Sequence, residues 1–123
     1  MPLPARAERS RRGVAVAAVF ILALATALLF ALAYPLPEVR YDSVEYLSLA
    51  RNLAAGKGFT QDGVAPSVYR PPLFSALLGG WFFLTGSSSP LSAAVFQSLE
   101  HAASVLVAFL LFLELTPSLV WAV

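Results

Sequence analysis

Charged residues are confined almost entirely to two blocks of this chain. Of its 15 charged residues, 13 lie within residues 1–12 and 38–70, whereas residues 13–37 and 71–99 carry none. The mean hydropathy of +0.76 is too high for an ordinary soluble domain. Because roughly 20 apolar residues are needed to cross about 30 Å of hydrocarbon, the pattern predicts an all-α membrane protein.

Composition excludes several classes of function. The chain has no cysteine, which excludes a disulfide scaffold, a cysteine-ligated metal site and a thiol nucleophile. Its net charge of +1 gives no electrostatic basis for binding nucleic acid.

The first predicted span covers residues 13–34. It follows a basic segment, residues 1–12, that sums to +3 and that we expect to stay in the cytoplasm by the positive-inside rule. Ala31-Leu32-Ala33 also resembles a signal-peptide cleavage site, but the apolar run exceeds the usual length of about 7 to 15 residues. We interpret it as an uncleaved anchor.

A polar segment, residues 35–72, follows and carries four basic and four acidic residues. Its neutrality is typical of an extracytoplasmic loop. Within it we expect an amphipathic interfacial helix over 42–55, ended by Gly56. Asp42 begins its apolar stripe, and Glu45 and Arg51 fall on the other side. Asp42-Ser43-Val44-Glu45 also fits a capping box, so Asp42 is either a helix cap, a functional carboxylate or both.

Two further spans are predicted, which makes three in total. Residues 73–86 form a short second span, although about 20 Å of helix is also compatible with a re-entrant element. Residues 90–115 form the third, with Ser89 as cap and Pro90 at the first helical position. Residues 118–123 begin a further helix that is cut short, which we interpret as truncation.

Two segments of the chain resemble a known family. YDSVEYLSLARNLAAGKGFT and VYRPPLFSALLGGWFFLTG are similar to the start of the membrane-embedded C-class glycosyltransferases. The likeness is to the glycosyltransferase family 39 branch, with its protein mannosyltransferase-like proteins and lipid A aminoarabinose transferases. It rests on the spacing of Asp42, Tyr46 and Arg51, on a Leu-Ala-Ala-Gly helix end, and on Arg70 before Pro71, and it covers about residues 14–115.

The resemblance implies a function for several residues. Asp42 takes the place of the catalytic base or of a carboxylate that assists a divalent cation, and Arg70, Lys57 and Arg51 would hold the phosphate of a polyprenyl-linked sugar donor. Where the family often has a second acidic residue, this chain has Ser43, with Glu45 as a substitute on another face. Tyr46 is a secondary candidate.

A polar stripe in the third span supplies the remaining candidates. Gln97, Glu100, His101 and Ser104 share one helix face, and ionisable groups at such depth normally face a bundle interior or a wet cavity. Hydrogen bonding between helices is one use, and a proton or ligand role for Glu100 and His101 is another.

These observations predict the N-terminal portion of an integral glycosyltransferase of the bacterial inner membrane. Its partners would be membrane lipids, the polyprenyl-phosphate sugar and a missing C-terminal transmembrane bundle. Two alternatives stay open: a small three-helix structural or accessory membrane protein, and a fragment of a transporter.

Overall fold

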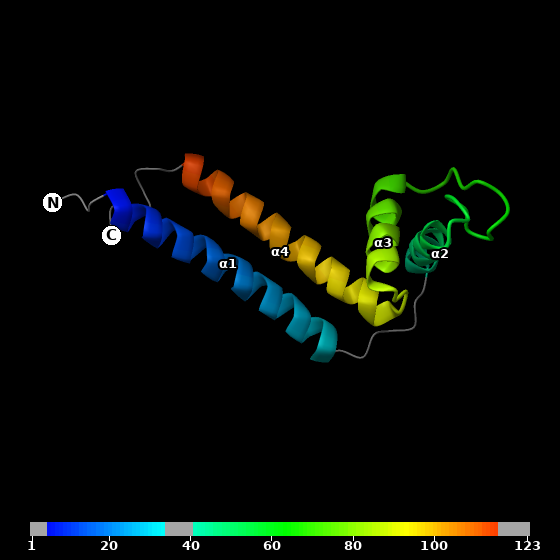
Figure 1. The fold of residues 1–123 in the computed structure, drawn as a ribbon, viewed down its shortest axis with the longest axis horizontal. Helices are drawn as coiled ribbons and strands as arrows, with labels where there is room; N and C mark the ends of the chain where they lie inside the picture. The colour runs from blue at the N-terminus through cyan, green and yellow to red at the C-terminus, as the bar shows by residue number, and fades with distance from the viewer. Residues whose placement is uncertain (1–4, 34–40, 116–123) are drawn as a thin grey trace. The chain divides into compact units, whose positions relative to one another are not determined.

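The computed structural model describes residues 5–33 and 41–115, and these residues form helices and loops without a strand. The four helices are α1 (Ala5–Ala33), α2 (Asp42–Ala54), α3 (Pro72–Thr85) and α4 (Pro90–Leu115), shown in Figure 1. The all-α prediction is confirmed for this part of the chain. The expected helix at 118–123 lies outside the described residues.

Within the described residues, two helices have the length and composition to cross a membrane. They are α4 and the Arg9–Ala33 part of α1. α1 starts at Ala5, so the helix continues through the basic segment instead of starting at its end. α3 has only 14 residues and is not among these candidate spans. The third crossing predicted for residues 73–86 is therefore not confirmed.

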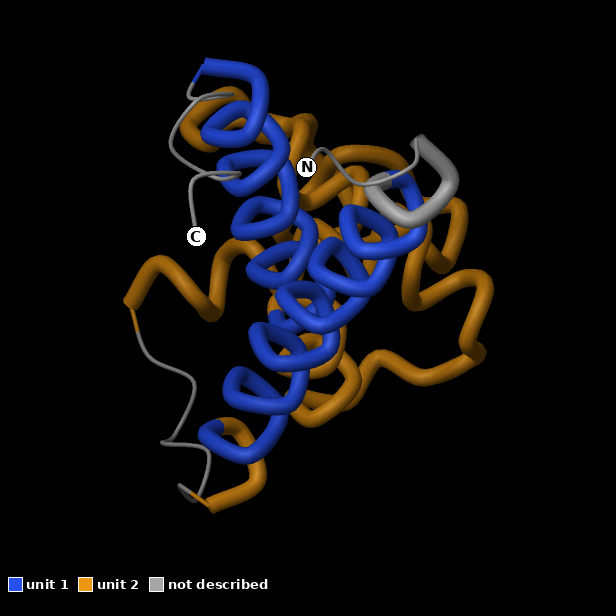
Figure 2. The backbone as a smooth tube through the Cα atoms, turned by 90° about the vertical axis from the view of Figure 1, so that its left-hand side faces the viewer, with its two compact units in different colours: residues 1–30, 98–123 blue, residues 31–97 orange. Residues whose placement is uncertain are grey.

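The chain divides into two compact units, residues 1–30 with 98–123 and residues 31–97, which Figure 2 colours separately. In the first unit the apolar window of α1 has no buried residue. Ile21 and Leu22, for example, are 64% and 70% exposed. Arg12 near the start of α1 forms an ion pair with Glu114 at the end of α4, with Nη2 and Oε1 2.5 Å apart. These two helix ends therefore lie together, and α1 and α4 run in opposite directions.

The second unit contains the packed core. Its centre is formed where α2 meets α3 and the start of α4, by the buried side chains of Leu47, Ala50, Leu78, Phe82 and Ala93. Tyr46 of α2 meets Phe74 of α3 edge to face, with ring centroids 5.4 Å apart. The apolar stripe of α2 is thus covered by α3.

Gly79 sets the distance between α2 and α3. A Cβ atom at this position would lie 3.0 Å from the Ala50 carbonyl oxygen and 3.1 Å from Leu53 Cβ. A side chain here would require the neighbouring helix to shift by a few tenths of an ångström, so glycine favours this close approach.

Two helix boundaries follow the predicted signals. After α2, Gly56 adopts a left-handed conformation, and the N–H groups of Gly56 and Lys57 donate to the carbonyl oxygens of Leu53 and Asn52. These are the two bonds of a Schellman motif. Before α4, Ser89 Oγ accepts a hydrogen bond from the Ser92 N–H, which satisfies one of the free donors of the first helical turn.

The start of α2 differs from the predicted capping box. Tyr41 is the residue before the helix, with a φ of 52° and no capping hydrogen bond from its side chain, and Asp42 is already helical. The prediction that Asp42 caps the helix is therefore wrong. Its carboxylate is instead bound by Arg70, whose Nη2 donates to Asp42 Oδ1.

Candidate functional site

Four side chains gather at the start of α2 and form what we call the Arg70 cluster: Asp42, Glu45, Tyr46 and Arg70. Arg70 donates from Nη2 to Asp42 Oδ1 and from Nε to Glu45 Oε2, both at 2.5 Å. Its Cζ atom lies 5.7 Å from the centroid of the Tyr46 ring. One guanidinium therefore bridges two carboxylates and faces an aromatic ring.

Local structure explains why these residues meet. Asp42, Glu45 and Tyr46 are three and four residues apart on α2, and such residues are neighbours on a helix surface. Arg70 directly precedes Pro71 and Pro72, whose rings restrict the backbone where α3 begins. The prediction that Asp42 and Glu45 face different sides is wrong, because both carboxylates reach the same guanidinium.

The cluster is charged and open to solvent. The hydrogen bond with Glu45, aided by the negative charges of Asp42 and Glu45, raises the pKa of Arg70 above its ordinary value against the opposing effect of burial. Two carboxylates against one guanidinium leave a formal charge of −1. The Asp42 side chain is 67% exposed, compared with 38% for Glu45 and 26% for Arg70. Asp42 is thus the carboxylate most accessible to a molecule arriving from outside.

Arg51 lies at the opposite end of α2 and has a different partner. Its Nε and Nη2 donate to the carbonyl oxygen of Ser88 at 3.1 and 3.0 Å. Arg51 is nine residues after Asp42, a rise of about 13.5 Å along the helix. The structure therefore does not bring Arg51 to the Arg70 cluster.

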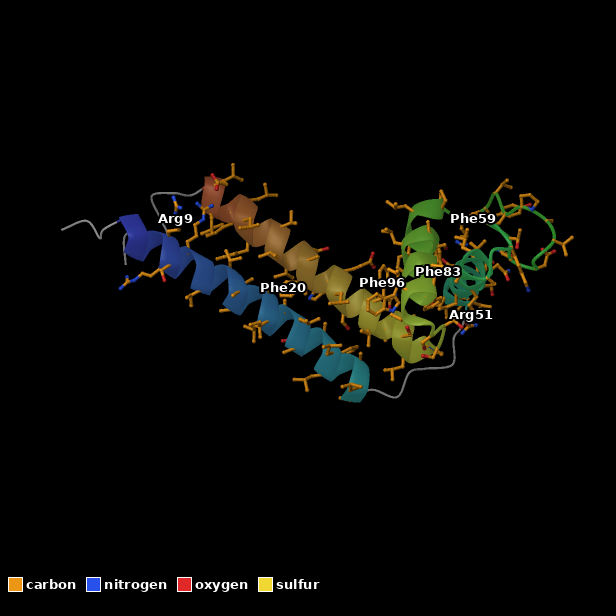
Figure 3. The ribbon with its side chains drawn as sticks, viewed as in Figure 1. Arg9, Phe20, Arg51, Phe59, Phe83 and Phe96 are labelled. Atoms are coloured by element: carbon orange, nitrogen blue, oxygen red, sulfur yellow. The ribbon has the colours of Figure 1, made fainter. Side chains whose placement is uncertain are left out.

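A pocket of about 290 Å³ adjoins Arg51. It lies between the last turns of α2 and α3, and Figure 3 labels Arg51 and Phe83 there. Its lining joins one guanidinium to two aromatic rings and small residues, namely Arg51, Ala54, Ala55, Phe82, Phe83, Gly86 and Ser88. Such a lining suits an amphipathic ligand with an anionic group.

Lys57 belongs neither to the Arg70 cluster nor to the lining of the pocket beside Arg51. It is exposed, and a Cβ atom built on Gly63 would lie 3.5 Å from its Cδ. Its side chain therefore extends over the loop between α2 and α3. The predicted grouping of Lys57, Arg51 and Arg70 around one phosphate stays a prediction, and the geometry supplies only Arg70 beside Asp42.

The candidates in the third predicted span lie on α4, where Glu100, His101 and Ser104 belong to the first compact unit and Gln97 is the last residue of the second. His101 is exposed and Glu100 is half-buried. Ser104 Oγ donates to the backbone carbonyl oxygen of Glu100 at 2.9 Å, a bond within the helix that involves the backbone of Glu100 and not its carboxylate. Their roles stay predictions.

The described residues contain no group of three metal-ligating side chains. Asp42 and Glu45 each use one carboxylate oxygen to accept a hydrogen bond from Arg70, and the divalent cation that the resemblance implies stays a prediction.

Sequence reasoning missed two contacts, the sharing of Arg70 by both carboxylates and the bond from Arg51 to Ser88. The first had a signal, the three-residue spacing of Asp42 and Glu45 before a basic residue fixed by two prolines. The second joins a side chain to a backbone carbonyl 37 residues away, and no sequence pattern marks such a contact.

Comparison of the chain with protein-family models, with curated proteins and with solved structures finds no match.

Proposed function

We propose that this chain is the N-terminal portion of an integral-membrane glycosyltransferase. It would transfer a sugar from a polyprenyl-phosphate donor to a lipid, glycan or protein acceptor, with Asp42 as the base. The observation that carries the proposal is the Arg70 cluster, in which the most exposed carboxylate lies 2.5 Å from a guanidinium. A base and an anion-binding group side by side are what this transfer requires.

The reaction is a single displacement at the anomeric carbon. The acceptor hydroxyl attacks that carbon and gives its proton to the Asp42 carboxylate, and the bond from the anomeric carbon to the phosphate oxygen breaks. The electron pair of the broken bond stays on the phosphate oxygen. Negative charge therefore grows on the leaving polyprenyl phosphate, where a guanidinium stabilises it most.

Arg70 is suited to receive this phosphate. A guanidinium has five N–H donors, and the contacts with Asp42 and Glu45 involve only Nη2 and Nε. Among the described residues these two are the side chains that Arg70 binds, and its remaining donors would bind phosphate oxygens, for which the planar fork of arginine is well matched. Glu45 would keep Arg70 in place while Asp42 turns to the acceptor.

The substitution Asp42→Asn, made in the natural gene and expressed in its own host, tests the proposal. The amide keeps the shape of the carboxylate but cannot act as a base, so we expect sugar transfer to fall by about 100-fold or more. The measurement is the transfer of radiolabelled sugar from a polyprenyl-phosphate donor in isolated membranes, normalised to the amount of inserted protein.

Asp62→Asn is the matched control. Asp62 is exposed, lies in the loop after α2 and accepts backbone hydrogen bonds through Oδ1, a role that an amide oxygen also fulfils. We expect this variant to transfer sugar at the normal rate. Near-normal transfer by Asp42→Asn at normal protein levels would refute the assignment of Asp42 as base.

A further inference from the structure

The crossing helices of this chain are constrained by a contact between their ends. Arg12 lies in the first part of α1 and Glu114 in the last turn of α4, and their side chains form an ion pair. Both helices are long enough to cross a membrane. If both cross, they do so in opposite directions, and the Arg12 and Glu114 ends lie at the same membrane face.

This direction restricts what lies between the two helices. A chain that crosses once through α1 and returns through α4 must cross an even number of times in between, or not at all. α2 carries Asp42, Glu45 and Arg51 within 13 residues, and charged groups inside hydrocarbon are costly. α3 is the remaining apolar helix of the described segment. If α3 alone crossed, the number of crossings between α1 and α4 would be one, which is odd.

The dimensions of α3 agree with this count. Its 14 residues give about 21 Å of helix, compared with about 30 Å of hydrocarbon. Charged side chains of α2 also make contacts at both ends of α3. Arg70, shortly before α3, pairs with two carboxylates of α2, and Arg51 of α2 donates to the Ser88 carbonyl oxygen shortly after α3.

α3 nevertheless has an apolar face that the protein does not cover. Leu73, Leu77, Phe83 and Leu84 are 70%, 50%, 74% and 81% exposed, while the opposite face packs on α2. α3 contains no charged residue. An exposed apolar surface of this kind marks an interaction site, and α3 leads through four residues, 86–89, directly into the α4 span.

We propose that α3 does not cross the membrane but lies in the lipid interface, with Leu73, Leu77, Phe83 and Leu84 in contact with acyl chains. The chain then crosses twice, through α1 and α4. The turn at Ser88 and the loop containing Gln61 are on the same side of the membrane, opposite to Ser10. This places the Arg70 cluster and the pocket beside Arg51 at one membrane surface, where the head group of a lipid is found.

Labelling of single cysteines distinguishes this topology from three crossings. The natural chain has no cysteine, and Ser10, Gln61 and Ser88 are all exposed. The variants Ser10→Cys, Gln61→Cys and Ser88→Cys are treated with a membrane-impermeant maleimide in right-side-out and in inverted membrane vesicles. We expect Ser88→Cys and Gln61→Cys to react in the same vesicles and Ser10→Cys in the other. Reaction of Ser88→Cys together with Ser10→Cys would overturn the proposal.

Depth measurement is a second readout that does not depend on access by the reagent. Leu73→Cys, Leu77→Cys and Leu84→Cys each receive an environment-sensitive fluorophore, and the protein is reconstituted with lipids brominated at shallow or deep acyl positions. A helix in the interface places all three probes at one shallow depth. A crossing helix would separate the first and last probes by about 16 Å, and that spread would also refute the proposal. Val68→Cys, an exposed loop position, is the control and should be quenched least.

Discussion

α1 and α3 are both apolar helices, but the protein covers them very differently. Ser75, Leu78 and Phe82 of α3 are 0%, 1% and 2% exposed, whereas the apolar window of α1 has no buried residue. One face of α3 packs on α2, because Gly79 allows the α2 backbone to approach closely. α1 leaves large apolar side chains such as Ile21, Leu22 and Leu29 exposed, which is typical of a helix that contacts lipid. Hydrophobicity alone therefore does not tell a membrane span from a helix that is packed on one side.

Of the variants considered, truncation of Leu78 should lower stability the most and so distinguish the packed face of α3 from α1. Leu78 is 1% exposed in the α2–α3 core, so Leu78→Ala leaves a cavity and should lower the free energy of unfolding by about 2–5 kcal/mol. The measurement is a denaturation series in mixed micelles, followed by the fluorescence of Trp81, which lies partly buried beside this core.

Two matched leucines serve as controls for this prediction. Leu77 is the neighbour of Leu78 but is 50% exposed, and Leu22 of α1 is 70% exposed. Their alanine variants should change stability by about 0.5 kcal/mol or less. Equal losses for Leu78→Ala and Leu77→Ala would mean that α3 has no preferred packed face, and the contrast with α1 would disappear.

The adjacent glycines of α3 give a smaller and sharper test. Gly79→Ala places a methyl group 3.0 Å from the Ala50 carbonyl oxygen, and the resulting overpacking should destabilise the α2–α3 pair by about 1–3 kcal/mol. Gly80→Ala meets no atom within 4 Å and should stabilise the helix by up to about 1 kcal/mol. The same denaturation series measures both. The close approach of α2 and α3 would be refuted if both variants gained stability.

Much of the fold follows from local sequence signals. Gly56 ends α2 and the Ser89–Pro90 pair starts α4, because a left-handed residue and a capping hydroxyl act within one turn of the chain. The uncharged run 13–37 likewise marks the apolar part of α1, whereas the run 71–99 covers both α3 and only the start of α4, so its length does not give the number of crossing helices. Periodicity does not decide whether a short run such as α3 packs on a neighbour, because packing depends on where Gly79 meets Ala50.

The candidate site was less predictable for the same reason. The residues Asp42 and Arg70 were recognisable one by one, but their contact joins positions 28 residues apart. A cap for α2 was the local expectation for Asp42, and it failed because Tyr41 is the residue before the helix and Asp42 is already helical. The Asp42 carboxylate pairs instead with a residue that is distant in the sequence.

Asp62 gives the smallest expected effect, in the loop that joins the packed helices. Its Oδ1 accepts hydrogen bonds from the N–H groups of Val64 and Ala65 at 2.9 and 3.0 Å. These bonds, that from Val64 first, lower the pKa of Asp62 below its ordinary value of 3.8. Since the folded chain binds the proton less tightly than the unfolded chain, the stabilisation is complete above pH 3.8 and is lost as the pH falls through the lower folded pKa. Amide chemical shifts of Val64 and Ala65 in micelles should therefore titrate with a midpoint below 3.8, and Asp62→Asn should abolish that titration. A midpoint at or above 3.8 would show that the carboxylate does not hold this turn.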